Sequence, residues 1–277
     1  VGFATYEEVE RAVTSKLDFD NTMGKIEEKA GDVDRLFGLF RKMQTAHGMD
    51  SKDFVEAKKQ LRDKLKILED TLNRYLAGEY GIEEGDKKSY KKWLESHQPF
   101  HWFIQFYGII KAGGFDVIIG NPPYVEYSKI KKDYSVKGYK TESCGNLYAM
   151  MIERSFRLLF NNGRKGMIVP HSSICTDRME PLISIFSKCS QYSWFSTYCI
   201  RPSKLFIGVD QRLAIYIVQK GNLSLASYSS KYHRWQEEFR SYLFHLTQYI
   251  NVSKTNFPNS IPKIHSIIEC NLWTKLM

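Results

Sequence analysis

The sequence has few of the features that mark membrane, disulfide-bonded or zinc-binding proteins. No apolar run approaches the roughly 20 residues that a membrane-spanning helix needs, and no N-terminal signal peptide is recognisable. The five cysteines are an odd number without a Cys-x-x-Cys pair, which argues against a disulfide framework and against a zinc ribbon. We therefore expect a soluble, cytoplasmic protein with reduced thiols, without membrane contact and without a bound metal.

Acidic residues are also fewer than basic residues. The chain has 31 Asp and Glu residues against 40 Lys and Arg, which gives a net charge of +9 at pH 7. The hydrophobic fraction of 43% is that of an ordinary globular protein. A polyanion is therefore the expected partner, and double-stranded DNA fits this expectation.

Residues 5–99 predict a region made of helices. Residues 22–43 and 51–77 carry apolar side chains at helical spacing, with an interruption expected near Gly31. These two segments are expected to pair as a long antiparallel helical hairpin across residues 46–49, with their apolar stripes as the packing seam. The alternative is that these helices form an arm that binds DNA or another subunit.

Beyond residue 100 the pattern changes to strands that alternate with helices. The expected strands cover residues 115–120, 166–170, 193–201 and 212–220, and the expected helices cover residues 145–160 and 176–190. Such alternation predicts an α/β fold with a mainly parallel sheet, and the last two strands predict one antiparallel hairpin. Residues 222–277 are rich in aromatic and basic residues, and we assign no secondary structure to them.

Residues 115–124 are the most informative segment, because a strand there runs into a rigid loop. The apolar run at 117–119 is typical of a strand that is buried on both faces of a parallel sheet. Pro122 and Pro123 have a fixed φ and restrict the residues before them, so the loop is held in one shape. The carboxyl end of a parallel strand is also where open α/β sheets bind ligands.

The loop presents groups that suit a planar amine. The side-chain oxygen of Asn121 and the carbonyl oxygen of Pro122 are hydrogen-bond acceptors, and Tyr124 adds a flat face on which a base can stack. The exocyclic amine of adenine would donate both hydrogens to two such acceptors, which favours a more nucleophilic nitrogen. Because this amine is inaccessible within a duplex, the nucleotide would have to flip out. The alternative is an ordinary turn whose tyrosine packs on the surface.

A basic loop follows directly. Its lysines are Lys129, Lys131, Lys132, Lys137 and Lys140, and they are interleaved with Tyr127, Tyr134 and Tyr139. We expect these cations and aromatic faces to surround a flipped base, with Lys129, Lys131 and Lys132 binding substrate phosphates. The alternative for each lysine is a solvated position on a mobile loop.

The decapeptide Phe-Asp-Val-Ile-Ile-Gly-Asn-Pro-Pro-Tyr resembles the fourth conserved motif of S-adenosylmethionine-dependent methyltransferases that modify adenine N6 in DNA. The lead-in at residues 100–114 resembles more specifically the bifunctional type II restriction enzymes of the IIS and IIG kind, which join a methyltransferase and a nuclease in one chain. The resemblance implies that Asn121 and Pro122 hold the amine, next to Pro123, and that Tyr124 stacks on the extruded adenine.

The same resemblance implies a partial Rossmann-like class I methyltransferase sheet and S-adenosylmethionine as the cofactor. Residues 205–209 resemble the eighth motif of the family, in which Phe206 would lie against the other side of the target base. A core position for Phe206 is an equally weighted alternative. Residues 171–173, after the strand that ends at Pro170, are further candidates for the lining of the cleft.

The glycine-rich donor-binding motif of that family is not found in residues 1–99. We therefore expect a fragment that begins after the donor-binding strands, binds S-adenosylmethionine weakly or not at all, and is inactive on its own. The expected domains are a helical region at 1–99, the target-base half of the catalytic core at 100–221, and an extension toward a target-recognition domain at 222–277. The edge of the strand at 115–120 should then be exposed, so that the helical arm or a second copy of the chain covers it.

The leading hypothesis is a site-specific adenine-N6 DNA methyltransferase of a bacterial restriction-modification system, with a fused nuclease left open. A non-catalytic module that binds DNA or protein is the alternative from another class. A protein-glutamine methyltransferase is a weaker rival, because an amide NH2 would satisfy the same two acceptors.

Overall fold

The computed structural model describes residues 1–15, 22–45, 51–83, 85–253 and 259–276. The chain divides into two compact units. The helical unit comprises Val1–Gly114 with Asp133–Ser135, and the sheet unit comprises Phe115–Lys132 with Val136–Met277. None of the helices in the described part of the chain is long and apolar enough to cross a membrane.

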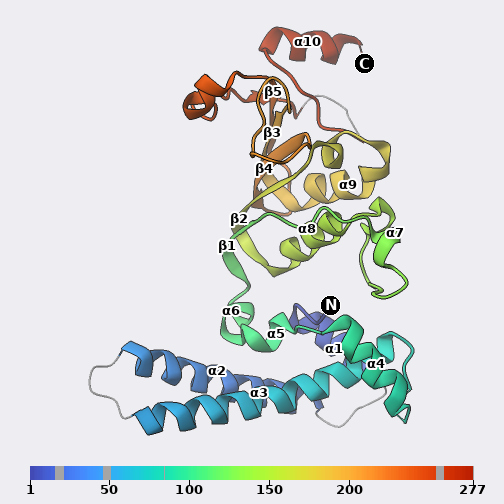
Figure 1. The fold of residues 1–277 in the computed structure, drawn as a ribbon, viewed down its shortest axis with the longest axis vertical. Coiled ribbons are helices and arrows are strands. Elements are labelled where there is room, and N and C mark those ends of the chain that lie inside the picture. The colour runs from blue at the N-terminus through green and yellow to red at the C-terminus, as the bar shows by residue number, and fades with distance from the viewer. Residues whose placement is uncertain (16–21, 46–50, 84, 254–258, 277) are drawn as a thin grey trace. The chain divides into compact units, whose positions relative to one another are not determined.

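The described residues of the helical unit form six helices. They are α1 (Tyr6–Ser15), α2 (Thr22–Thr45), α3 (Ser51–Glu79), α4 (Lys87–His97), α5 (Trp102–Gln105) and α6 (Tyr107–Lys111). The predicted antiparallel pairing of α2 with α3 is confirmed (Figure 1), and the rings of Phe40 and Phe54 stack with centroids 4.7 Å apart. The expected interruption near Gly31 is wrong, because α2 runs through that residue without a break. The connection at residues 46–49 lies outside the described residues.

The core of the helical unit extends past residue 99. Phe103, Ile104 and Tyr107 are buried in the same apolar cluster as Leu68 and Leu72 of α3. Residues 100–114 therefore pack with the helices, whereas we placed them with the catalytic core. The division into three functional domains stays a prediction.

In the described part of the sheet unit, six strands form a sheet in the order β1-β2-β4-β3-β5-β6. The strands are β1 (Phe115–Gly120), β2 (Leu159–Pro170), β3 (Ser190–Tyr198), β4 (Leu213–Lys220), β5 (Ala226–His233) and β6 (Ile250–Asn251). The α-helices of this unit are α7 (Tyr127–Ile130), α8 (Leu147–Leu158), α9 (Glu180–Cys189) and α10 (Ile267–Leu276). β1, β2, β3 and β5 run in one direction, and β4 lies antiparallel between β2 and β3. The predicted α/β fold, with a mainly parallel sheet and a β3–β4 hairpin, is confirmed, while the short antiparallel β6 was not expected.

One face of the sheet carries the core. Tyr148, Ile152 and Phe156 of α8 pack there against strand residues that include Met167 and Val169. The residues of β2 that face this core alternate with residues that do not, as the pleat of a strand requires. α8 therefore begins beside the carboxyl ends of the parallel strands, which is where the candidate site lies.

β1 is an edge strand, and this corrects one expectation. Val117 and Ile119 are 57% and 83% exposed, so the strand is not buried on both faces. The reason is its place at the end of the sheet, where β2 is its only partner among the described strands and only Ile118 reaches the core. β1 lies at the end of the described sheet, as we expected. Coverage by a second copy of the chain stays a prediction.

Residues 222–253 and 259–276 contain more secondary structure than the sequence indicated. β5 pairs in parallel with β3, and β6 pairs antiparallel with β5. The strand β5 was missed because it is rich in serine and lacks an apolar run, although Ser229 and Ser230 are both buried. This part of the chain therefore extends the sheet.

Candidate functional site

The loop after β1 brings Asn121 and Tyr124 together. The hydroxyl of Tyr124 lies 2.6 Å from Asn121 Oδ1 and 3.0 Å from the carbonyl oxygen of Ile168. A phenol has one hydrogen, so Tyr124 donates to one of these two acceptors at a time. Asn121 is exposed, Pro122 is buried and Tyr124 is half-buried. The rigid loop thus holds the amide of Asn121 at the surface beside an aromatic ring.

Backbone contacts on both sides fix the position of this loop. Gly113 and Gly114 have φ of 109° and 121°, a region that residues with a side chain rarely adopt, and they turn the chain into β1. At the far end, the N–H of Leu147 donates to the carbonyl of Val125 at 3.0 Å. The loop is therefore tied to the first turn of α8.

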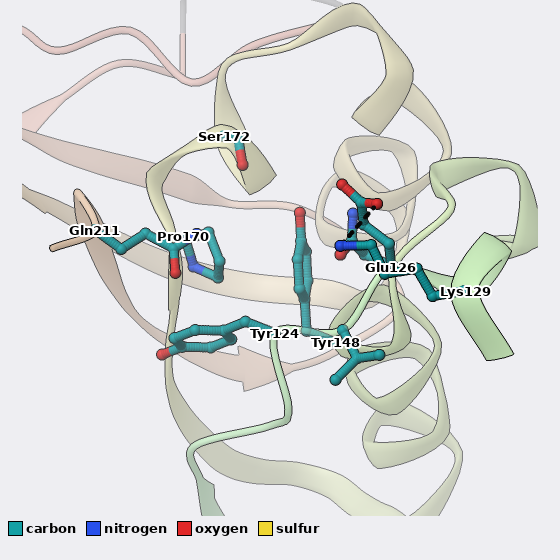
Figure 2. Close-up of a pocket in the computed structure, with 9 residues that line it drawn as sticks. Tyr124, Glu126, Lys129, Tyr148, Pro170, Ser172 and Gln211 are labelled. Atoms are coloured by element: carbon teal, nitrogen blue, oxygen red, sulfur yellow. Dashed lines mark ion pairs between the residues drawn. The ribbon is translucent and has the colours of Figure 1, made fainter. Parts of the chain in front are cut away.

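A cavity of about 370 Å³ adjoins Tyr124. It is lined by Tyr124, Val125, Glu126, Lys129, Asn146, Tyr148, Pro170, Ser172 and Gln211. Figure 2 shows the ring of Tyr124 below Pro170, and the ring of Tyr148 between Pro170 and Glu126. The two rings are nearly perpendicular, with an interplanar angle of 85° and centroids 6.4 Å apart. The volume lies in the range of about 300–1,000 Å³ that is usual for small-molecule sites.

The cavity is polar with little net charge. Burial raises the pKa of both Tyr124 and Tyr148, so both phenols stay protonated near neutral pH. The ammonium of Lys129 pairs with the carboxylate of Glu126 at 3.5 Å (Figure 2). Such a lining favours an uncharged planar ligand with polar edges over an anion.

The predicted substrate lysines occupy different surroundings. Lys129 lines the cavity. Lys131 pairs with Glu142 at 3.6 Å and lies over the ring of Tyr127, while Lys132 is exposed. Only Lys129 of these three therefore reaches the cavity.

The tyrosines between these lysines do not surround the cavity, which corrects a second expectation. Tyr127 is buried, and its hydroxyl accepts a hydrogen bond from the N–H of Val136 at 2.8 Å. Tyr139 lies beneath the guanidinium groups of Arg154 and Arg157. The sequence pattern placed these rings at the ligand because their burial could not be recognised from it.

Phe206 does not line the cavity. Its side chain is 40% exposed, and its neighbour Leu205 belongs to the apolar cluster against which Tyr124 packs. The loop that carries Phe206 thus lies near Tyr124, and its predicted contact with a base stays a prediction.

Comparison of the sequence with models of known protein families identifies the family of this chain. The model of the Eco57I restriction-modification methylase family matches residues 17–198, which is more than half of the chain. The chain belongs to the Eco57I restriction-modification methylase family. The predicted relationship to methyltransferases of restriction-modification systems is thereby confirmed, and a DNA methyltransferase is the activity class of this family.

Individual relatives agree with this assignment. A protein of Methanocaldococcus jannaschii described as a type II restriction enzyme and methyltransferase is 34% identical over 143 residues, which is 48% of this chain and 12% of the relative. The chain therefore spans about an eighth of that relative, and the activity of a whole enzyme does not carry over from it.

Solved structures show weaker likeness. The DrdV–DNA complex is 11% identical with a TM-score of 0.43, covering 55% of this chain and 18% of that one. A modification subunit of a type I restriction enzyme from Vibrio vulnificus is 10% identical with a TM-score of 0.37, covering 81% and 66%.

Within this Eco57I family member, the sequence did not single out Asn146, Tyr148, Pro170 or Gln211 as site residues, although they line the cavity. Pro170 ends β2 and thus lies at the carboxyl edge of the sheet next to β1, a position that the sheet rule for ligand sites indicates. The candidate segment 171–173 contributes Ser172. Gln211 could not be found by this rule, because it lies in the loop before β4 and not at the end of a parallel strand.

The described residues do not form a donor site of the expected kind. No strand precedes Phe115 in residues 1–15, 22–45, 51–83 and 85–114, so no strand there leads into a glycine-rich loop. The described residues upstream of β1 therefore do not provide the strand and glycine-rich loop that would hold S-adenosylmethionine.

Proposed function

We propose that this chain is the target-base half of an adenine-N6 DNA methyltransferase of a restriction-modification system. The observation that carries the proposal is the contact between Asn121 and Tyr124 at the carboxyl end of β1, beside an uncharged polar cavity. Membership of the Eco57I restriction-modification methylase family supports DNA as the substrate class.

The proposed role of the loop is to hold the amine of a flipped adenine. Asn121 Oδ1 and the carbonyl oxygen of Pro122 accept the two amine hydrogens, and this draws the nitrogen lone pair out of conjugation with the ring. Pro123 keeps the corner rigid, because a second fixed φ restrains Pro122 itself. No strong base is required, since the loop acts through position and electrostatics.

Tyr124 would serve the base in two ways. Its ring offers a stacking surface, a contact worth about 1–3 kcal/mol. Its hydroxyl occupies Asn121 Oδ1 in this structure, but the carbonyl of Ile168 is a second acceptor within 3.0 Å. The hydroxyl can therefore shift to Ile168 and release Asn121 when the amine arrives.

The methyl donor we propose is S-adenosylmethionine, supplied with a donor-binding segment. The chain by itself should give no calorimetric signal with S-adenosylmethionine at submillimolar concentration, because no strand in its described residues leads into a glycine-rich loop before β1. A clear heat of binding with one-site stoichiometry would contradict this prediction. S-adenosylhomocysteine serves as the control ligand, since it fills the same cradle without the reactive methyl group.

Methyl transfer to different acceptors tests the function. A polypeptide that joins a donor-binding segment to this chain is incubated with methyl-labelled S-adenosylmethionine and with either duplex DNA or protein. We expect label in DNA, recovered after digestion as N6-methyl-2′-deoxyadenosine, and loss of that label with Asn121→Ala. Label in protein glutamine would favour the amide alternative. Undiminished label in the Asn121→Ala variant would refute the site assignment.

A further inference from the structure

A second cavity in the sheet unit is lined mainly by arginine. It has a volume of about 470 Å³, and its lining residues are Cys199, Ile200, Arg201, Arg212 and Arg234. No carboxylate is among them. The guanidinium of Arg234 lies 6.0 Å from the centroid of the Tyr232 ring, whose face helps to orient it.

Strand pairing explains why these arginines meet. Tyr198 at the end of β3 pairs with Leu213 at the start of β4 and with His233 at the end of β5. Arg212 and Arg234 are the residues just beyond these pairs. The cavity therefore lies at the carboxyl edge of the parallel strands, the same edge as the loop after β1.

The positive charge of this cavity is not neutralised within the described residues. Neither the ion pairs nor the hydrogen bonds of residues 1–15, 22–45, 51–83, 85–253 and 259–276 join one of the three arginines to a carboxylate. Asp210 already pairs with Lys204, and Glu237 already pairs with Arg240. Like charges without a counter-ion repel one another, so an anionic ligand would relieve this repulsion.

The two cavities are neighbours along the chain. Gln211 lines the cavity beside Tyr124, and Arg212 lines the arginine cavity. The N–H of His171 donates to the carbonyl of Arg212 at 2.9 Å, which joins the end of β2 to the same segment. The pKa of His171 is lowered to about 4, first by burial and then by the positive charges of Lys263 and Arg212.

We propose that the cavity of Arg201, Arg212 and Arg234 binds a backbone phosphate of the DNA strand that carries the target nucleotide. The planar guanidinium matches phosphate oxygens with two parallel hydrogen bonds, which lysine cannot do. A phosphate held there lies one residue away from the wall of the base cavity, so it fixes the strand beside the flipped nucleotide. This inference rests on the proposed function.

Salt-dependent DNA binding tests the inference. The affinity of the full chain for a labelled DNA duplex is measured between about 50 and 200 mM salt, where log K falls by about 0.9 per decade of salt for each phosphate neutralised. We expect the double variant Arg212→Gln/Arg234→Gln to bind at least about 10-fold more weakly and to lose about one unit of slope.

Two further variants separate charge, geometry and folding. Lys188→Gln/Lys275→Gln removes the same charge from exposed positions on α9 and α10, and it should leave the slope nearly unchanged. Arg212→Lys/Arg234→Lys should keep the slope but lose affinity, because it retains the charge without the guanidinium fork. Circular dichroism melts of all variants report whether the fold is retained.

Several outcomes would overturn the inference. They are an unchanged slope in Arg212→Gln/Arg234→Gln, equal losses in the lysine control, or a parent chain whose DNA binding does not depend on salt. Inorganic phosphate that binds the parent but not the glutamine variant, with DNA binding unchanged, would assign the cavity to a small free anion. Methylation of adenine with normal DNA binding by the arginine variants would sink this inference alone. DNA binding through the arginines, without any adenine methylation by the polypeptide that also carries a donor-binding segment, would sink the proposed function instead.

Discussion

Asn121→Ala is expected to lower the rate of methyl transfer to DNA adenine by about 100-fold or more, the usual cost of removing one preorganised hydrogen-bonding group from an active site. The amide oxygen is one of only two acceptors that we assign to the amine, and the substitution leaves Pro122 alone. DNA binding should change little, because Asn121 is exposed and contributes no charge. Single-turnover rates at saturating DNA, in a polypeptide that includes a donor-binding segment, measure the effect.

Substitutions of Tyr124 provide the matched control for this experiment. Tyr124→Phe keeps the stacking ring and removes the hydroxyl that occupies Asn121 Oδ1, so the rate should stay within about 10-fold of the parent. Tyr124→Ala removes the stacking surface and should weaken base binding by about 1–3 kcal/mol. If Tyr124→Phe were as inactive as Asn121→Ala, the hydroxyl and not the ring would be the important group. A fully active Asn121→Ala variant would refute the assignment of the amide.

The elements with strong local patterns were predictable from the sequence. β1 was placed to the residue, because an apolar run there is bounded by Gly114 and Gly120. α3 was placed to within two residues at its end, because its leucines recur at helical spacing from Leu61 to Leu76, which is about four turns. In both cases the decisive information is contained in neighbouring residues.

Features that depend on distant partners were not predictable in this way. The exposure of Ile119 follows from the position of β1 at the end of the sheet, which no local pattern contains. Gln211 enters the cavity because β4 is inserted between β2 and β3, and this insertion brings the loop before β4 to the carboxyl edge. For the site, the rigid corner could be found from the sequence, whereas the opposite wall of the cavity could not.

Lys165 is the clearest case in which sequence and structure differ. Between Gly163 and Gly166, next to Arg164, it reads as part of a turn, and the strand was expected to start one residue later. Instead β2 begins earlier, at Leu159. Lys165 therefore points to the same face of the strand as Met167, and it is only 1% exposed. The ammonium nitrogen donates to the carbonyl of Ile152 at 3.0 Å and to Ser155 Oγ at 2.9 Å.

Lys165→Met is accordingly expected to stabilise the sheet unit near neutral pH and to flatten its dependence on pH. Burial first, and then the charge of Lys220, lowers the pKa of Lys165 well below its ordinary value. In the window between the folded and unfolded pKa values, the unfolded chain binds a proton that the folded chain does not. Stability therefore rises with pH up to the unfolded pKa, by about 1.4 kcal/mol per pH unit, and is lost as the pH falls toward the folded pKa.

Methionine has a similar length and no charge to bury, so the Lys165→Met variant does not lose stability in this way as the pH falls. When the ammonium of Lys165 is removed, the carbonyl of Ile152 does not lose its last hydrogen bond, because Ser155 Oγ still donates to it at 2.6 Å. Urea-dependent hydrogen exchange of peptides from β2 and α8, between about pH 7 and pH 9, follows this unit separately from the helical one. Lys188→Met, at an exposed position on α9, should behave as the parent does. Equal slopes for parent and Lys165→Met would mean that the buried ammonium keeps its ordinary pKa, and the stabilisation would then have no physical basis.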